Sequence, residues 1–169
     1  LLVDDQELIM FEWRKYLHSR SQTNTQSVEL LFNNKWIKIS PLFKVLQAHR
    51  AQLLNSERLF VSLTGGDKAD RKQGYMGNEM RLATGERTGK LGGKRREALD
   101  KYGYSPKNFV QLLRLARSGQ VFFSTGVFPS NFAAVERELA EELRDIKLNP
   151  EKYKKKELVA RCEQERVKL

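Results

Sequence analysis

The stretch from Tyr102 to Gly119, YGYSPKNFVQLLRLARSG, has the pattern of a single amphipathic helix. Ser105 can cap the free N–H groups, and Pro106 fits the first helical position, where its missing N–H is not needed. Gly119 predicts the end of the helix. The apolar side chains recur with helical spacing and predict a core-facing side, formed by Phe109, Val110, Leu112, Leu113 and Ala116.

The other side of this helix carries a polar stripe. Lys107, Gln111, Arg114 and Ser118 follow one another at i, i+4, i+7 and i+11, so they share a face. The stripe contains two cations and no carboxylate. We interpret it as a face whose negative charge is supplied by a ligand.

Composition points to a basic protein of modest size. The 169 residues suit one domain, or one domain and a small part of another, and 31 lysines and arginines against 21 carboxylates give a net charge of +10. Between Lys68 and Arg117 there are thirteen cations and five carboxylates. Such a local surplus favours a polyanionic partner, either nucleic acid or nucleotide phosphate. The simpler alternative is a basic surface that only keeps the protein soluble.

Several classes of protein are excluded by what the sequence lacks. A single cysteine, Cys162, excludes an internal disulfide, and His18 and His49 are too isolated to suggest a zinc site. No apolar run approaches the roughly 20 residues that span a bilayer, and no signal peptide is visible. We therefore expect no membrane partner and a cytoplasmic location.

The pattern along the chain predicts a mainly α protein. A short strand is expected near residues 6–10, followed by a helix, and a glycine-rich loop is expected over residues 84–93. Further helices are predicted to begin at Ser40–Pro41, over residues 75–83, 94–103, 105–119 and 133–147, and after Asn149–Pro150.

Basic residues gather around the glycine-rich loop and the central helix. Glycine-rich loops and helix N-termini both favour phosphate, although the spacing here is not that of a P-loop. The alternative is a flexible loop followed by a solvated basic helix. The candidate anion-binding residues are Lys90, Lys94, Arg95, Arg96, Lys107, Arg114 and Arg117.

Three carboxylates lie near the amino end, at Asp4, Asp5 and Glu7. Asp5 and Glu7 are two residues apart, so on a strand they would share a face. Carboxylates at strand ends hold Mg²⁺ in nucleotidyl transfer. The alternative is that they are ordinary acidic residues at a frayed chain start.

Several stretches, taken in order, resemble the predicted nucleotidyltransferases of the DNA polymerase β superfamily found in bacteria and phages. The family carries segments similar to DxDxxxYELRKFLRLLLKGNPNxLELLF, SPLFxxLxxxRxxFLS, GYxxGQLxxL and KRRELxEKYGYDTKHAxHLVRLLRMGxELLxTG. This chain has, in the same order, DQELIMFEWRKYLHSRSQTNTQSVELLF, SPLFKVLQAHRAQLLN, GYMGNEMRLA and KRREALDKYGYSPKNFVQLLRLARSGQVFFSTG. The resemblance covers residues 5–126 well and the later helices loosely.

The resemblance implies a helical carboxy-terminal domain over residues 33–169, preceded over residues 1–32 by the end of a catalytic α/β part. The family's glycine–serine and D-x-D motifs would lie upstream, and this sequence does not contain them. As given, the chain would lack two of the three metal ligands and is not expected to catalyse alone.

The resemblance also implies an activity: transfer of a nucleotidyl group from an NTP, with Mg²⁺, to a hydroxyl acceptor such as RNA or DNA. The setting would be a bacterial or phage-infected cell. Glu7 would be the catalytic metal ligand, with Asp5 beside it.

Lys107 and Arg114 match the family's cations and would bind phosphate. Asn108 and Gln111 stand where the family has two histidines, so they would line the same nucleotide site without any histidine chemistry. Polyanion-guiding cations are expected on the neighbouring basic segment, at Lys94, Arg95, Arg96 and Arg117.

Two other functions stay open at this stage. The chain could be a basic helical nucleic-acid-binding module, or a relative that kept the scaffold and lost the chemistry. It could also be a protein-interaction scaffold. Nucleic-acid binding alone would weaken steeply with salt and need no Mg²⁺.

Overall fold

The fold is mainly α, as predicted. The computed structural model describes residues 2–3, 6–7, 16, 18, 25–36, 38–64, 74–86, 92–129 and 131–169. At the amino end, β1 (Leu2–Val3) and β2 (Gln6–Glu7) pair antiparallel, with Leu2 opposite Glu7. The predicted strand therefore includes residues 6–7, whereas residues 8–10 lie outside the described part of the chain.

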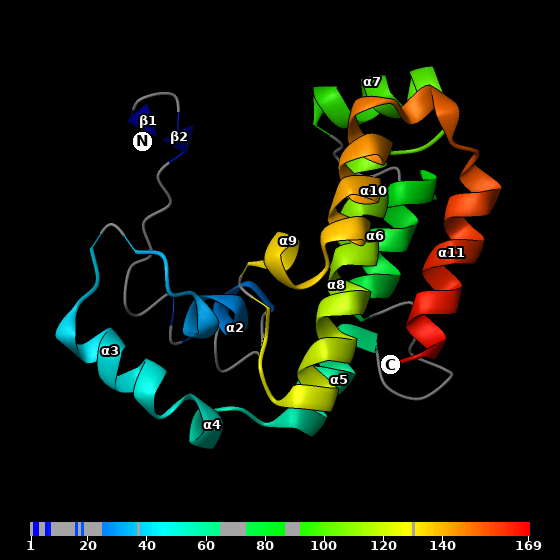
Figure 1. The fold of residues 1–169 in the computed structure, drawn as a ribbon. Helices are drawn as coiled ribbons and strands as arrows, with labels where there is room; N and C mark the ends of the chain where they lie inside the picture. Colours follow the sequence, from blue (N-terminus) through cyan, green and yellow to red (C-terminus); the bar gives the residue numbers. More distant parts are fainter. Residues whose placement is uncertain are drawn as a thin grey trace.

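The helices follow in an order that Figure 1 shows. The first four are α2 (Thr25–Phe32), α3 (Pro41–Ala48), α4 (Arg50–Leu53) and α5 (Ser56–Thr64). The central ones are α6 (Tyr75–Thr84), α7 (Gly93–Tyr102) and α8 (Pro106–Thr125). The last are α9 (Phe132–Val135), α10 (Arg137–Leu148), the 3₁₀ turn η1 (Pro150–Lys152) and α11 (Lys155–Val167).

Helix α8 begins where the sequence predicts and ends later. Pro106 is its first residue, but the Ser105 hydroxyl donates to Asn108 Oδ1 (2.7 Å) instead of capping a backbone N–H. The helix ends at Gly126, which adopts the left-handed conformation at φ 73°. The prediction that Gly119 ends the helix is wrong. Gly119 permits close packing instead, because a Cβ there would lie 2.7 Å from Leu169 Cδ2.

Two apolar clusters meet along α8. The larger one joins α8 to α6, α10 and α11 and is centred on Phe109, which is fully buried and packs edge-to-face on Tyr104 with ring centroids 5.6 Å apart. The smaller one joins α2, α5 and α8 and contains Val28, Leu59, Leu63, Phe122 and Phe128. Helix α8 is therefore the axis of the fold, as its apolar pattern predicts.

Polar contacts fasten the carboxy-terminal helices to this axis. Lys155 Nζ donates to the carbonyl of Thr84 (2.7 Å) at the end of α6, and Tyr104 Oη donates to the carbonyl of Pro150 (2.6 Å). The last helix begins at Lys155, later than the predicted start after Pro150, because residues 150–152 form the 3₁₀ turn. In Figure 1, α6, α8, α10 and α11 form one bundle.

Helices α3 and α4 lie away from that bundle, at the end of a segment that leaves α2 (Figure 1). Ser40 caps α3 as predicted, its hydroxyl accepting from Phe43 N–H (3.2 Å). The helix predicted here breaks at His49 into two pieces. Neither piece contributes a fully buried side chain. No helix in the described part of the chain is both long enough and apolar enough to cross a lipid bilayer. The domain boundary between residues 32 and 33 stays a prediction.

Candidate functional site

Polar side chains from three helices meet at one side of α8. We call this the polar cluster, and its members are Glu29 of α2, Tyr75 and Glu79 of α6, and Asn108, Gln111 and Arg114 of α8. Asn108 Nδ2 donates to Glu79 Oε2 (2.6 Å), and Arg114 Nε donates to Gln111 Oε1 (3.4 Å). The structure thus brings together three of the four predicted nucleotide-binding residues.

Arg114 has a carboxylate partner. Its Nη1 lies 2.8 Å from Glu29 Oε1, and both side chains are about one-quarter exposed, at 26% and 24%. The prediction that the cations of the polar stripe are unpaired is therefore wrong for Arg114. The sequence shows no partner because Glu29 lies on a different helix, 85 residues earlier in the chain.

The Arg114–Glu29 contact leaves hydrogen-bonding capacity in place. Glu29 Oε1 is buried and accepts no aligned hydrogen bond in the described part of the chain, although it touches the guanidinium. A guanidinium has five N–H donors, and the described contacts of Arg114 occupy Nε and one side of Nη1. The pair is therefore a charge contact, and several N–H donors of Arg114 remain unused by the described contacts.

Tyr75 interacts with both the carboxylates and the cation of the cluster. Burial raises the pKa of its phenol, and the negative charges of Glu79 and Glu29 raise it further. A hydrogen bond with Gln111 and the charge of Arg114 act in the opposite direction without reversing the shift of the pKa. Tyr75 therefore remains a neutral hydroxyl in the neutral pH range, able to donate and to accept a hydrogen bond.

Lys107 lies one residue before Asn108, in the first turn of α8, and is exposed. No carboxylate within ion-pair distance is found for it among the described residues. Because the free N–H groups at a helix N-terminus also favour anions, Lys107 occupies a position suited to phosphate. The structure keeps this part of the prediction open.

The predicted polyanion-binding residues lie on two helices, α7 and α8. Arg117 of α8 pairs with Glu136, its Nη2 lying 2.9 Å from Oε1. Lys94, Arg95 and Arg96 lie on α7, where Arg95 is half-buried and the other two are exposed.

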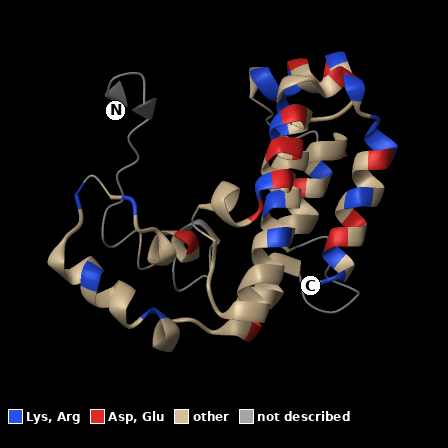
Figure 2. Ribbon diagram, viewed as in Figure 1, with Lys and Arg blue, Asp and Glu red and all other residues tan. Residues whose placement is uncertain are grey.

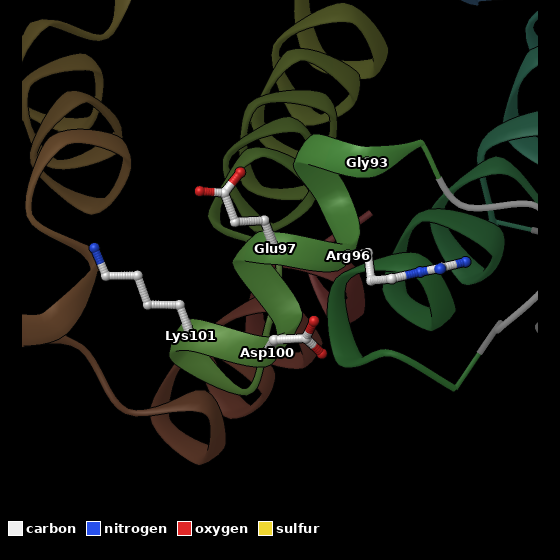
Figure 3. A pocket seen from close by; sticks show the side chains of 5 residues that line it. All are labelled: Gly93, Arg96, Glu97, Asp100 and Lys101. Carbon is white, nitrogen blue, oxygen red and sulfur yellow. The ribbon is translucent and has the colours of Figure 1, made fainter.

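Helix α7 carries acids among its cations. A shallow, open hollow of about 550 Å³ is lined by Gly93, Arg96, Glu97, Asp100 and Lys101. Figure 3 shows Glu97 and Lys101 extending to one side of the helix and Arg96 and Asp100 to the other. Since these side chains diverge and alternate in charge, the hollow does not gather cations around a ligand.

The predicted metal ligand is described only in part. Glu7 lies in β2, paired with Leu2, and its side chain and the whole of Asp5 lie outside what the structure describes. Among the described residues, no group of three histidine, cysteine or acidic side chains could hold a metal ion. The described residues therefore do not by themselves fit a Mg²⁺ site.

Sequence reasoning missed two sets of residues. Glu29, Tyr75 and Glu79 complete the polar cluster from other helices, and no local pattern marks them. The second set comprises exposed cations around α3 and α4, at Lys35, Lys38, Lys44 and Arg50. The sequence from Leu30 to Ser56 contains no carboxylate, but neither do residues 101–135, so this pattern alone does not single out the set.

Comparisons with known proteins give no relative: no family model, no curated protein and no solved structure matches this chain.

Proposed function

We propose that this chain is the helical part of a nucleotidyltransferase of the polymerase β type, and that the polar cluster with Lys107 binds the nucleotide. The observation that carries the proposal is the cluster itself. Asn108, Gln111 and Arg114, the positions that the family resemblance selects, join Tyr75, Glu79 and Glu29 in one network between three helices. Helix interfaces are ordinarily apolar, so a polar one supports a binding role.

Each charged group has a distinct role in this proposal. Arg114 and Lys107 bind phosphate, the first through its planar set of donors and the second as a point charge. Glu79 is an acceptor for hydroxyl or amino groups of the nucleoside, and Tyr75 both donates and accepts. The phosphate competes with Glu29 for Arg114, so Glu29 holds the guanidinium in place when no ligand is bound.

The chemistry asked of these residues is mainly positioning. Transfer of a nucleotidyl group to a hydroxyl needs alignment of the reacting groups and neutralisation of phosphate charge. Mg²⁺ would supply further charge neutralisation, with Glu7 as the ligand that the resemblance suggests. Because the described residues do not gather a metal site, we assign no step to the metal.

The test compares two arginines that each form an ion pair. We expect Arg114→Ala to weaken NTP binding, measured calorimetrically with and without Mg²⁺, by at least about tenfold because a charge-assisted hydrogen bond is lost. Arg137→Ala is the matched control, since Arg137 pairs with Glu141 on the exposed face of α10 (Nε to Oε1 3.1 Å). Equal losses in both variants would contradict the proposal.

A second variant separates binding from structure. Glu29→Gln removes the carboxylate that competes with phosphate while keeping the size of the side chain. We expect it to tighten NTP binding by about three- to fivefold, since a surface-type ion pair is worth up to about 1 kcal/mol. Weaker binding in this variant would mean that Glu29 and Arg114 form a structural pair, and the proposal would fail.

A second candidate function is nucleic-acid binding without transfer. It is favoured by the exposed cations around α3 and α4, which have no acidic neighbours in the sequence. Because the chain as given is not expected to catalyse alone, calorimetric titrations with NTP and, separately, with RNA or DNA oligonucleotides distinguish the two. NTP binding that Arg114→Ala weakens supports a part in transfer, whereas oligonucleotide binding without NTP binding supports the second candidate.

A further inference from the structure

The segment around α3 and α4 combines a sequence without carboxylates and cations that form no ion pair with a described carboxylate. We call residues 33–53 the basic arm. Its cations are Lys35, Lys38, Lys44 and Arg50, and all four side chains are exposed. No carboxylate occurs from Leu30 to Ser56, and no ion pair joins these four cations to a described carboxylate. Figure 2 shows only basic charged positions along α3 and α4.

The arm is held through one face of α3. Phe43 of α3 packs edge-to-face against the Trp36 ring at 5.1 Å and the Tyr16 ring at 5.2 Å. Gln47 Nε2 donates to the carbonyl of Asn33 at 2.7 Å. These contacts attach α3 to Tyr16 and to the segment that follows α2, while Leu42, Lys44 and Val45 of α3 are exposed.

Arg50 is positioned by its own contacts. Its guanidinium lies 5.3 Å from the centroid of the Phe32 ring, and Nη1 donates to the carbonyl of Gln47 (3.0 Å). These contacts satisfy part of its donor capacity without neutralising its charge. The guanidinium therefore has a defined position and is not paired with any described carboxylate.

Apolar side chains lie among these cations. Leu42 and Val45 of α3 are 53% and 54% exposed, and Leu53 of α4 is 40% exposed. Leu42 and Val45 are three residues apart and thus share a face of α3. Two aliphatic side chains make a small patch, far below the roughly 800 Å² per partner of a standard protein interface.

We propose that the basic arm binds single-stranded nucleic acid. The arm contains no carboxylate, so phosphates of the strand supply the negative charge that pairs with Lys35, Lys38, Lys44 and Arg50. Such phosphate contacts provide most of the affinity for nucleic acid. Leu42 and Val45 contact bases, which are accessible when the strand is unpaired. If the chain is part of a transferase, this strand is the acceptor. That last assignment rests on the proposed function, whereas the binding does not.

The experiment measures fluorescence anisotropy of labelled 20-nucleotide RNA and DNA strands of one sequence, at 50 to 200 mM KCl. Four phosphate contacts predict a log–log salt slope near −2.8 and about a 50-fold loss of affinity over this range. The double variant Lys38→Gln/Lys44→Gln is expected to halve the slope and to reduce the loss to about sevenfold. The RNA and DNA strands together show whether the arm discriminates between them.

A matched variant controls for net charge. Lys147→Gln/Lys156→Gln removes two exposed lysines from α10 and α11, and it should leave the slope unchanged. Leu42→Ser should lower affinity several-fold at every salt concentration without changing the slope. Circular dichroism confirms that each variant keeps its helices.

Three results would overturn the proposal. The first is an equal loss in the arm variant and in the α10–α11 control. The second is competition by poly-glutamate as effective as by unlabelled oligonucleotide at equal charge, which would indicate an acidic protein partner. The third is binding of phosphatidylserine vesicles, but not of oligonucleotides, that depends on Lys38 and Lys44.

This test fails separately from that of the proposed function. Arg114→Ala is expected to leave oligonucleotide affinity unchanged, and the arm variant is expected to leave NTP affinity unchanged. Loss of NTP binding alone would affect only the transferase. Loss of oligonucleotide binding alone would affect only the arm.

Discussion

The bundle and the basic arm treat positive charge in opposite ways. In the bundle, arginines meet carboxylates of neighbouring helices or turns: Arg117 meets Glu136, and Arg161 contacts both Glu142 and Glu165. In the arm, Lys38 and Lys44 meet none among the described residues. These paired bundle arginines therefore help to hold the bundle together, whereas the arm cations stay available to a polyanion. A positive net charge indicates a polyanionic partner, but only the ion pairs in the structure show which surface the partner can use.

The bundle and the basic arm also differ in the burial of their side chains. Phe109 of α8 is fully buried, and α3 contributes no fully buried side chain. Since stability comes mainly from apolar area removed from water, the bundle carries the fold and the arm adds little to it. Changes in the arm should thus affect binding, and changes in the bundle should affect stability.

The largest expected effect tests that division directly. Phe109→Ala should lower the free energy of unfolding by about 3–5 kcal/mol because it removes a buried ring and leaves a cavity. Leu42→Ala, in the arm, should change it by less than about 0.5 kcal/mol, as exposed positions do. Urea denaturation followed by circular dichroism measures both. A loss above 2 kcal/mol for Leu42→Ala would mean that the arm is part of the core.

Much of the fold was predictable because it depends on local signals. Ser40 and Pro106 mark helix starts, and the apolar spacing from Phe109 to Ala116 selects the buried side of α8. The end of α8 was not predictable, because Gly119 serves contact with Leu169 at the far end of the chain. From the sequence alone, a glycine that ends a helix cannot be distinguished from one that allows another side chain to pack closely against the helix.

Only the part of the candidate site that lies on α8 was predictable from the sequence. Gln111 and Arg114 were found because they share one helical stripe with Lys107, and Asn108 was found through the family resemblance. Glu29, Tyr75 and Glu79 were missed because they reach the cluster through tertiary packing, so the stripe was read as unpaired. The basic arm was missed for another reason: residues 101–135 also lack carboxylates, and only the tertiary structure shows that Arg114 and Arg117 are paired and the arm cations are not paired with a described carboxylate.

A middle-sized effect concerns the most buried carboxylate of the bundle. Glu165 is 4% exposed. Burial alone would raise its pKa, but hydrogen bonds from Lys168 Nζ (2.8 Å) and Gln120 Nε2 (3.0 Å) and the charge of Arg161 lower it below its ordinary value. A carboxyl group with a lowered pKa in the folded state stabilises above its unfolded pKa and loses that contribution as pH falls through the lower value.

We therefore expect Glu165→Gln to be less stable than the parent protein by about 1–3 kcal/mol at pH 7, and the gap to close below pH 4. Urea titrations at several pH values measure it. Glu138→Gln, at an exposed position in the first turn of α10, is the control and should show a smaller gap, of roughly 0.3–1 kcal/mol at pH 7. A gap independent of pH would mean that the side chain acts through packing alone.

The smallest expected effect concerns the polar cluster, where we propose that Arg114, a cation of the bundle, binds a ligand. It tests whether Arg114 is a structural cation, like the other paired arginines of the bundle, or an anion-binding one, like the cations of the arm. A double-mutant cycle of Glu29→Gln and Arg114→Ala should give a coupling energy of about 0.5–1 kcal/mol, because both side chains are about one-quarter exposed and their contact is not an aligned hydrogen bond. Such a pair can exchange its carboxylate for a phosphate. A coupling energy above about 2 kcal/mol would place Arg114 with the structural cations of the bundle, and the arm would then be left as the anion-binding surface.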